Sequence, residues 1–196
     1  MMDQAISPQT MRQPAKKDSF TSYLGMIIAV ASFAMLFIAL LASYGILRAR
    51  AGLWMSYAIG TVPLLRAWLN TGVIVLSSFT YHMGTGSARN EEKNRLTFWL
   101  NITFMIGVIF LVLQWNLWRM LIEDGFTISA HQAGSVFYML SGLHGMHIIG
   151  GLCLMIWLMR KIRHGGNMMN TIKLVGMFWH FLTVIWVVIF ITVILI

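Results

Sequence analysis

Residues 141–159 read SGLHGMHIIGGLCLMIWLM, and no Asp, Glu, Lys or Arg occurs among them. The charge-free interval extends back to residue 125 and ends at a basic group that begins with Arg160. A helix needs roughly 20 apolar residues to cross the hydrocarbon layer of a bilayer. This stretch therefore predicts a membrane-spanning helix, and it carries two histidines, His144 and His147, that need an explanation.

The same pattern occurs in four other parts of the chain. Intervals without Asp, Glu, Lys or Arg cover residues 19–47, 67–88, 96–118 and 174–196. Each is long enough to span a bilayer, and none shows the alternating polarity of a barrel strand. The sequence predicts an all-α integral membrane bundle of five transmembrane helices over residues 20–196, preceded by a flexible cytoplasmic tail over residues 1–19.

The composition agrees with a membrane location. Hydrophobic residues make up 58% of the chain and charged residues only 10%, whereas a soluble domain carries about 25% charged residues. The formal net charge of +8 could indicate a nucleic-acid binder. The basic residues fall in short runs between apolar segments, however, and this arrangement favours the flanks of membrane helices over a nucleic-acid partner.

Five spans would place the two termini on opposite sides of the membrane. Ten basic residues then share the side of the amino terminus and four share the other side. Because cytoplasmic loops carry the excess of Lys and Arg, we expect a cytoplasmic amino terminus and a periplasmic carboxyl terminus in a bacterial inner membrane. The ten are Arg12, Lys16, Lys17, Arg89, Lys93, Arg95, Arg160, Lys161, Arg163 and Lys173, and the four are Arg48, Arg50, Arg66 and Arg119.

The charge-free spans disfavour several functions. Ion-coupled transporters and proton pumps place carboxylates inside the bilayer, and no predicted span contains one. The chain also has no G-x-S-x-G nucleophile motif and no P-loop. Its single cysteine, Cys153, has no second sulfur with which to form a disulfide or a metal site.

Three histidines lie deep within predicted spans, and two interpretations of them are open. His144, His147 and Gly151 share one helix face at spacing i, i+3, i+7, and His180 lies about two turns into the last span. The imidazoles could hydrogen-bond across helices, with Gly145 and other small residues allowing close approach. Alternatively, the three histidines could converge on a metal or haem, but no carboxylate would join them. The residues favour the first interpretation.

Other polar residues of the second and third spans are expected to bridge helices by hydrogen bonds, each contributing about 0.6 kcal/mol. These residues are Asn70, Thr71, Ser77, Ser78, Thr80, Asn101, Thr103, Gln114 and Asn116. Arg66 and Arg119, at the outer ends of the same spans, are candidates for pairing with lipid phosphates. Simple extension of their side chains to the membrane surface explains them equally well.

Taken together, four segments resemble subunit III of the haem–copper terminal oxidases in its short five-helix form. The long segment 124–151 is similar to the family's F-T-I-S and G-x-H-G-x-H elements. The last segment is similar to its closing W-H-F-x-D-x-x-W helix, with Trp179, His180 and Trp186 at matching positions. The resemblance covers about residues 20–196. The segments are YLGMIIAVASFAMLF (23–37), NTGVIVLSSFTYH (70–82), DGFTISAHQAGSVFYMLSGLHGMHIIGG (124–151) and WHFLTVIWVVIF (179–190).

The resemblance implies a role inside a larger respiratory complex. Members of this family carry no haem and no copper, pack beside catalytic subunit I, and bind phospholipids in grooves. We therefore expect no catalytic, metal or cofactor site in this chain, with haem and copper in partner subunits such as I and II. Helix-packing or lipid contacts are expected of His144, Gly145, His147, Gly151, Trp179, His180, Trp186, Arg66 and Arg119.

The expected function is that of a non-catalytic subunit of an oxidase that reduces O2 to water, with cytochrome c favoured as the electron donor. A quinol oxidase subunit III and an accessory subunit of a nitric oxide reductase are the alternatives within the resemblance. A membrane metalloenzyme using His144, His147 and His180 is the alternative from another class.

The chain departs from the family pattern at three acidic positions. Phe33 lies where the opening helix often has a glutamate, and Thr183 replaces the aspartate of W-H-F-x-D. Gln114, Leu117 and Trp118 occupy the positions of a Q-x-x-E-Y element, so that Leu117 replaces its glutamate. These departures disfavour a role in proton uptake through buried acids. Assembly, lipid binding and protection of the catalytic subunit remain as expected roles.

Overall fold

The computed structural model describes residues 15–51, 61–89, 92–125, 132–163 and 169–195. These residues form five α-helices, and a short π-helical segment, η1, continues the last of them. The prediction of an all-α chain is therefore confirmed for the described residues. The helices are α1 (Ala15–Ala51), α2 (Thr61–Arg89), α3 (Lys93–Glu123), α4 (Gln132–Arg163) and α5 (Met169–Ile189), followed by η1 (Phe190–Leu195).

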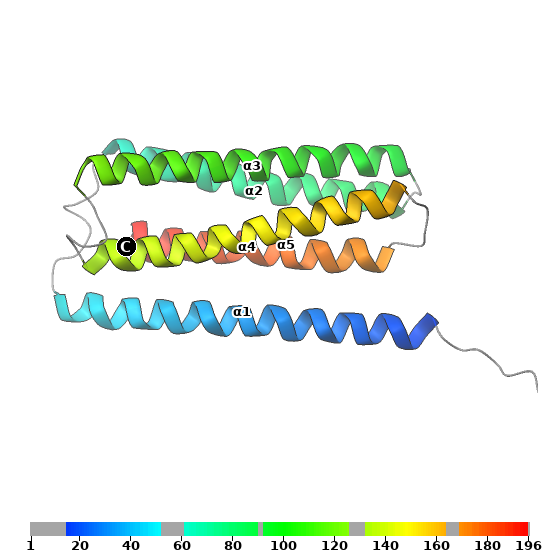
Figure 1. Cartoon of the computed structure of the whole chain (residues 1–196), viewed down its shortest axis with the longest axis horizontal. Coiled ribbons are helices and arrows are strands. Elements are labelled where there is room, and N and C mark those ends of the chain that lie inside the picture. Colours follow the sequence, from blue (N-terminus) through cyan, green and yellow to red (C-terminus); the bar gives the residue numbers. More distant parts are fainter. Residues whose placement is uncertain (1–14, 52–60, 90–91, 126–131, 164–168, 196) are drawn as a thin grey trace, which may run out of the picture.

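The helices lie side by side and alternate in direction along the bundle (Figure 1). Helices α2 and α3 form one layer, α4 and α5 form the next, and α1 lies on the outside against α4 and α5. α1 begins at one end of the bundle, and the carboxyl terminus lies at the other (Figure 1). α1 starts at Ala15, before the predicted span, and residues 1–14 of the predicted tail lie outside the described residues.

Four of the described helices are long and apolar enough to cross a membrane. The candidate spans are Phe20–Leu47, Lys93–Glu123, Gly134–Arg163 and Met169–Val193. The second helix, α2, has 29 residues but a more polar composition, and it falls outside this set. The sequence prediction of membrane-spanning helices therefore holds for four segments by length and composition.

Several uncharged polar residues of α2 face the inside of the bundle. Asn70, Ser77 and Thr80 are buried, whereas Leu76 and Phe79 are more than half exposed. A helix on the surface of a soluble protein has the opposite arrangement, with polar residues outside. The middle of the outer face of α2 is thus apolar, whereas Arg66 and His82 are exposed toward its two ends.

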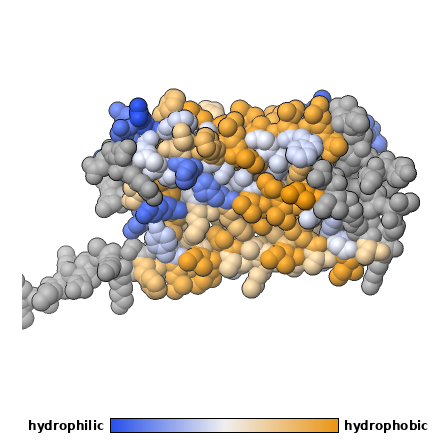
Figure 2. Space-filling view, turned by 180° about the vertical axis from the view of Figure 1, so that it is seen from behind, coloured by the Kyte–Doolittle hydropathy of each residue, from blue (hydrophilic) through white to orange (hydrophobic). Residues whose placement is uncertain are grey.

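The outer surface of the bundle is mainly apolar between its two ends. Figure 2 shows this apolar middle section, with hydrophilic residues gathered toward the end at which α1 begins. Large side chains such as Met35, Trp115 and Met146 are more than 60% exposed. Apolar patches of this extent are rare on soluble monomers, and they suit lipid acyl chains.

Local sequence accounts for the end of α3. Gly125 follows Glu123 and Asp124 and has a φ of +82°, a conformation that glycine adopts without a steric penalty. The backbone N–H groups of Asp124 and Gly125 donate to the carbonyl oxygens of Met120 and Ile122 at 2.9 and 3.0 Å. These bonds satisfy two carbonyl groups of the last turn.

Two buried apolar clusters follow one another along the bundle. The first contains Tyr81, Leu100 and Trp179 and draws on α2, α3, α4 and α5. The second contains Phe37 of α1 and Phe137 of α4, together with residues of α2, α3, α5 and η1. All five helices therefore contribute to one continuous interior.

Candidate functional site

Buried hydroxyl groups connect α2 to α3 and α5. The indole N–H of Trp179 donates to Ser77 Oγ at 3.1 Å, and Ser77 Oγ donates to the Thr103 carbonyl oxygen at 3.4 Å. The hydroxyls of Thr80 and Thr103 lie 2.9 Å apart. Three helices are joined here by side chains that are almost fully buried.

A second group of bonds lies nearer the opposite end of α2. Asn70 Nδ2 donates to Gln114 Oε1 at 2.8 Å, which joins α2 to α3. The indole N–H of Trp186 donates to Thr71 Oγ1 at 3.2 Å, which joins α5 to α2. Such bonds fix the register of one membrane helix against another.

Seven of the nine polar residues proposed from the sequence form hydrogen bonds between helices, which confirms the expected role for them. Ser78, one of the seven, bonds to His180 and is described below. It is wrong for Asn101 and Asn116, which lie exposed on the outer face of α3. Among the described residues, no hydrogen bond joins either side chain to another helix. Both residues share the helix face of Met105 and Val112, which points away from α2 and α4.

His180 makes a hydrogen bond between helices. Its Nδ1 lies 2.5 Å from Ser78 Oγ on α2. The imidazole also meets the rings of Tyr81 and His82, at centroid distances of 5.8 and 6.4 Å. This histidine therefore joins α5 to α2, as expected of an intramembrane imidazole.

His147 instead bonds within its own helix. Its Nδ1 lies 2.7 Å from the Leu143 carbonyl oxygen, one turn earlier on α4. The ring packs edge-on against Phe33 of α1 at a centroid distance of 4.5 Å and lies 5.6 Å from Phe37. Its contact with the neighbouring helix is aromatic.

His144 is fully buried and has three aromatic rings around it. Phe37, Phe110 and Trp186 lie at centroid distances of 6.4, 6.0 and 5.1 Å and come from α1, α3 and α5. The side chain has no solvent exposure, and neither ring nitrogen has a hydrogen-bond partner in the described part of the chain. The expected interhelical hydrogen bond of His144 is thus absent among the described residues.

The three histidines do not converge. His180 faces α2, whereas His144 and His147 face the phenylalanines of α1. Within residues 15–51, 61–89, 92–125, 132–163 and 169–195, no three His, Cys, Asp or Glu side chains lie close enough together to hold a metal ion. The described geometry thus gives no support to the metalloenzyme alternative.

Glycines allow two large aromatic side chains to enter the interior. A Cβ atom on Gly151 would lie 3.0 Å from the Trp179 ring, and one on Gly107 would lie 2.9 Å from it. A Cβ atom on Gly176 would lie 2.6 Å from the ring of Tyr81. Gly145, also in the histidine motif, has no neighbour within 4 Å of such an atom.

The two arginines proposed to contact lipid are both exposed. Arg119 lies 3.7 Å from Glu123, one turn further along α3, with both side chains about two-thirds exposed. Exposed ion pairs of this kind contribute little to stability. Both guanidinium groups therefore remain accessible at the end of the bundle where α2 begins and α3 ends.

The three positions at which the family pattern has acids make ordinary packing contacts. Phe33 contacts His147, as described above. Leu117 is buried in the second apolar cluster, and Thr183 Oγ1 donates to the Trp179 carbonyl oxygen at 3.2 Å. Trp118, the residue after Leu117, donates its indole N–H to Ser141 Oγ at 3.2 Å. Each side chain forms part of the bundle interior or its edge.

Sequence reasoning missed the donors that complete this network. Tyr81 donates its hydroxyl to the Ile172 carbonyl oxygen of α5 at 2.8 Å and is fully buried. A buried Tyr or Trp usually finds a hydrogen-bond partner for its polar end. The position of Tyr81 inside a predicted span was therefore a signal from which this donor could have been identified.

A bundle with buried polar residues, an apolar exterior and several helices long enough to span a bilayer defines a multi-pass membrane protein. Comparison with known proteins identifies its family. The family model described as cytochrome c oxidase subunit III matches residues 14–196. The chain therefore belongs to the cytochrome c oxidase subunit III family of the haem–copper oxidases.

Bacterial relatives agree with this membership. The chain is 31% identical over 173 residues to cytochrome c oxidase subunit 3 of Synechocystis, covering 86% of this chain and 73% of that protein. It is 34% identical over 174 residues to the probable cytochrome c oxidase subunit 3 of Nocardia farcinica, covering 87% and 85%. It is also 34% identical over 125 residues to subunit 3 of the cytochrome bo(3) ubiquinol oxidase of Pseudomonas aeruginosa, covering 62% and 60%.

Proposed function

We propose that this chain is a non-catalytic subunit III of a respiratory haem–copper oxidase, which reduces O2 to water in a bacterial inner membrane. The observation that carries the proposal is the family match over residues 14–196, which includes every described helix. The catalytic subunit I and subunit II would hold the haem and copper. This subunit would support assembly, lipid binding and stability of the catalytic subunit.

Its side chains support a non-catalytic role. His180 faces α2, whereas His144 and His147 face α1, and His144 is fully buried with rings from three helices around it. At two of the positions where the family pattern has acids, Leu117 is buried and Thr183 donates a hydrogen bond within α5. Redox chemistry needs a metal or an organic cofactor, and in this proposal both reside in the partner subunits.

We further propose that α2 is the fifth transmembrane span. Its 29 residues run alongside α3 (Figure 1), and large apolar side chains such as Leu69, Leu76 and Phe79 are exposed along it. The alternating helices would then place the amino terminus in the cytoplasm, because the loops on that side carry most of the basic residues. The carboxyl terminus would face the periplasm.

Cytochrome c is the proposed electron donor of the complex, because the relatives that match most of this chain are named for cytochrome c oxidase. The quinol oxidase relative supports a second candidate, a subunit III of a quinol oxidase. The partner subunits would separate the two. A subunit II with a copper centre and a cytochrome c docking face would support the first candidate.

Phospholipids are the proposed ligands of the outer surface. Arg66 and Arg119 are exposed cations near the end of the bundle that would face the periplasm. Guanidinium groups pair well with phosphate oxygens. Their replacement by glutamine would reduce the phospholipid retained after purification, whereas replacement of the exposed Asn116, about one turn before Arg119 on α3, would leave it unchanged.

Co-purification tests the proposed function. We expect an affinity tag on the amino terminus of this chain to recover a haem–copper subunit I from native membranes in a mild detergent, at a fixed ratio and with oxidase activity. Mass spectrometry of the recovered subunits would also identify the donor class. A chain that migrates alone in every detergent tested, with oxidase activity in other fractions, would contradict the proposal.

A further inference from the structure

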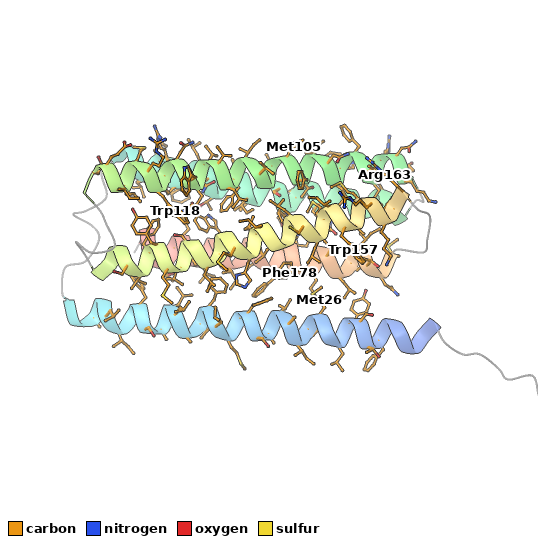
Figure 3. All side chains as sticks on the ribbon, viewed as in Figure 1. Met26, Met105, Trp118, Trp157, Arg163 and Phe178 are labelled. Carbon is orange, nitrogen blue, oxygen red and sulfur yellow. The ribbon has the colours of Figure 1, made fainter. Side chains whose placement is uncertain are left out.

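A groove between α1 and the α4–α5 pair contains a single imidazole on an otherwise apolar wall. It has a volume of about 420 Å³, and its lining includes Met26 and Phe33 of α1, His147 and Gly150 of α4, and Phe178 of α5. In Figure 3, Met26 and Phe178 lie in the space between α1 and the neighbouring pair. The groove is open on one side, where Met146 is largely exposed.

The hydrogen bond of His147 determines what this imidazole can offer a ligand. Nδ1 lies 2.7 Å from the Leu143 carbonyl oxygen, and a carbonyl can only accept, so Nδ1 carries the proton. A neutral imidazole protonated at Nδ1 leaves Nε2 as a hydrogen-bond acceptor. Nε2 has no partner in the described part of the chain. The groove therefore offers one acceptor for a hydroxyl or N–H donor.

The position of His147 along α4 limits which molecules can donate a hydrogen bond to its Nε2. It lies 15 residues after Gln132 and 16 before Arg163 (147 − 132 and 163 − 147), and Phe33 lies 18 residues from each end of α1 (33 − 15 and 51 − 33). Both are thus at the middle of helices that span the bundle. Phospholipid headgroups and esters lie about 15 Å or more from the bilayer midplane. A donor for Nε2 must come from a molecule that enters the hydrocarbon itself.

We infer that the groove binds a membrane-dissolved small molecule with an apolar body and one hydroxyl group, which donates to Nε2 of His147. The volume falls within the range of about 300–1,000 Å³ for small-molecule sites, which combine apolar and aromatic walls with few polar groups. Phe33 packs against the imidazole at 4.5 Å and holds its plane. An acyl chain would fill the apolar part but leave the acceptor without a partner. The inference does not rest on the proposed oxidase function, because its observations lie within α1, α4 and α5.

Two probes that differ in one hydrogen-bond donor test the inference. 4-Decylphenol has the apolar body and the hydroxyl, and 4-decylanisole has the same body with the donor methylated. The full tagged chain, with its co-purifying subunits, is reconstituted in phosphatidylcholine nanodiscs, and binding of each radiolabelled probe is measured by equilibrium dialysis. We expect saturable binding of 4-decylphenol, about two- to tenfold tighter than that of 4-decylanisole, as one hydrogen bond implies.

Three substitutions test whether the preference for 4-decylphenol over 4-decylanisole arises in the groove. His147→Phe keeps the ring and removes both nitrogens, so it should abolish the preference for the phenol. Gly150→Leu has room for its Cβ and should weaken both probes by filling the groove, whereas Gly45→Leu, exposed elsewhere on α1, should change neither. Equal affinity of both probes for the unmodified chain, a preference that survives His147→Phe, or no saturable binding would overturn the inference.

Discussion

The two sides of this bundle are held together by different kinds of contact. On one side, α2 is joined to α3 and α5 by hydrogen bonds from buried hydroxyl, amide and indole groups, such as Trp179 to Ser77. On the other side, Phe33 and Phe37 of α1 pack against the imidazoles of α4. The serines Ser32 and Ser43 of α1 donate only to carbonyl groups of α1 itself.

This difference implies that α2, α3 and α5 are held in one arrangement, whereas α1 can shift slightly against α4. Hydrogen bonds are directional, and a buried group that loses its partner destabilises the fold. Ring contacts tolerate small displacements better, because they depend on area and approximate orientation. The groove beside His147 lies on the side of ring contacts, where Phe33 and Phe37 of α1 meet the imidazole.

The largest effect is expected from closing the space that Tyr81 occupies. In Gly176→Val, the new Cβ would meet a fully buried ring at 2.6 Å, so the free energy of unfolding should fall by about 3 kcal/mol. Reversible unfolding in mixed micelles measures it. Gly72→Val on α2 is a control, because Gly72 has open space around it. Equal loss in both variants would contradict close packing between α2 and α5.

Trp179→Phe should have the next largest effect. The change removes the indole N–H that donates to Ser77 and leaves part of the space beside Gly151 unfilled. We expect a loss of roughly 2 kcal/mol in the free energy of unfolding. Trp157→Phe, at a half-exposed position on α4, should cost much less when measured in the same way.

The amide pair between α2 and α3 should show a measurable coupling. A double-mutant cycle with Asn70→Ala and Gln114→Ala isolates their interaction, for which we expect about 1 kcal/mol, within the range found for such bonds in membranes. A cycle that pairs Asn70→Ala with Asn116→Ala, exposed on the far face of α3, should give no coupling. Similar coupling in both cycles would show that the measured energies do not report the bond.

The smallest effect is expected from a serine of α1. Ser32→Ala removes a bond within one helix at an exposed position and should change the free energy of unfolding by less than about 0.5 kcal/mol. The matched change on α2, Ser77→Ala, leaves the buried Trp179 N–H without its acceptor and should cost about 1–2 kcal/mol. If the two changes cost the same, the contrast between the two sides is wrong.

The sequence predicted the helices well because charge-free length is a local property. Runs such as 96–118 reveal a span without knowledge of its neighbours, and a polar residue within a span must find a partner inside the bundle. That logic identified Asn70, Thr71 and Gln114 correctly. It failed for Asn101 and Asn116, because the outward direction of a helix face depends on how the other helices pack around it.

The contacts of the histidines could not be predicted from their spacing. His144 and His147 share a helix face, yet one is enclosed by rings from three helices and the other borders an open groove. The difference arises from the position of α1, whose phenylalanines lie more than 100 residues away in sequence. A single sequence specifies such a long-range arrangement only through packing.

The haem and copper content of complexes with altered histidines tests the central claim most directly. The claim is that the buried histidines organise helices and that the redox centres belong to partner subunits. Complexes carrying His144→Leu or His147→Leu should be recovered in lower yield or with less lipid, but with unchanged haem spectra and copper content per catalytic subunit. A fully assembled complex that lacks a haem band or copper after either substitution would contradict the account.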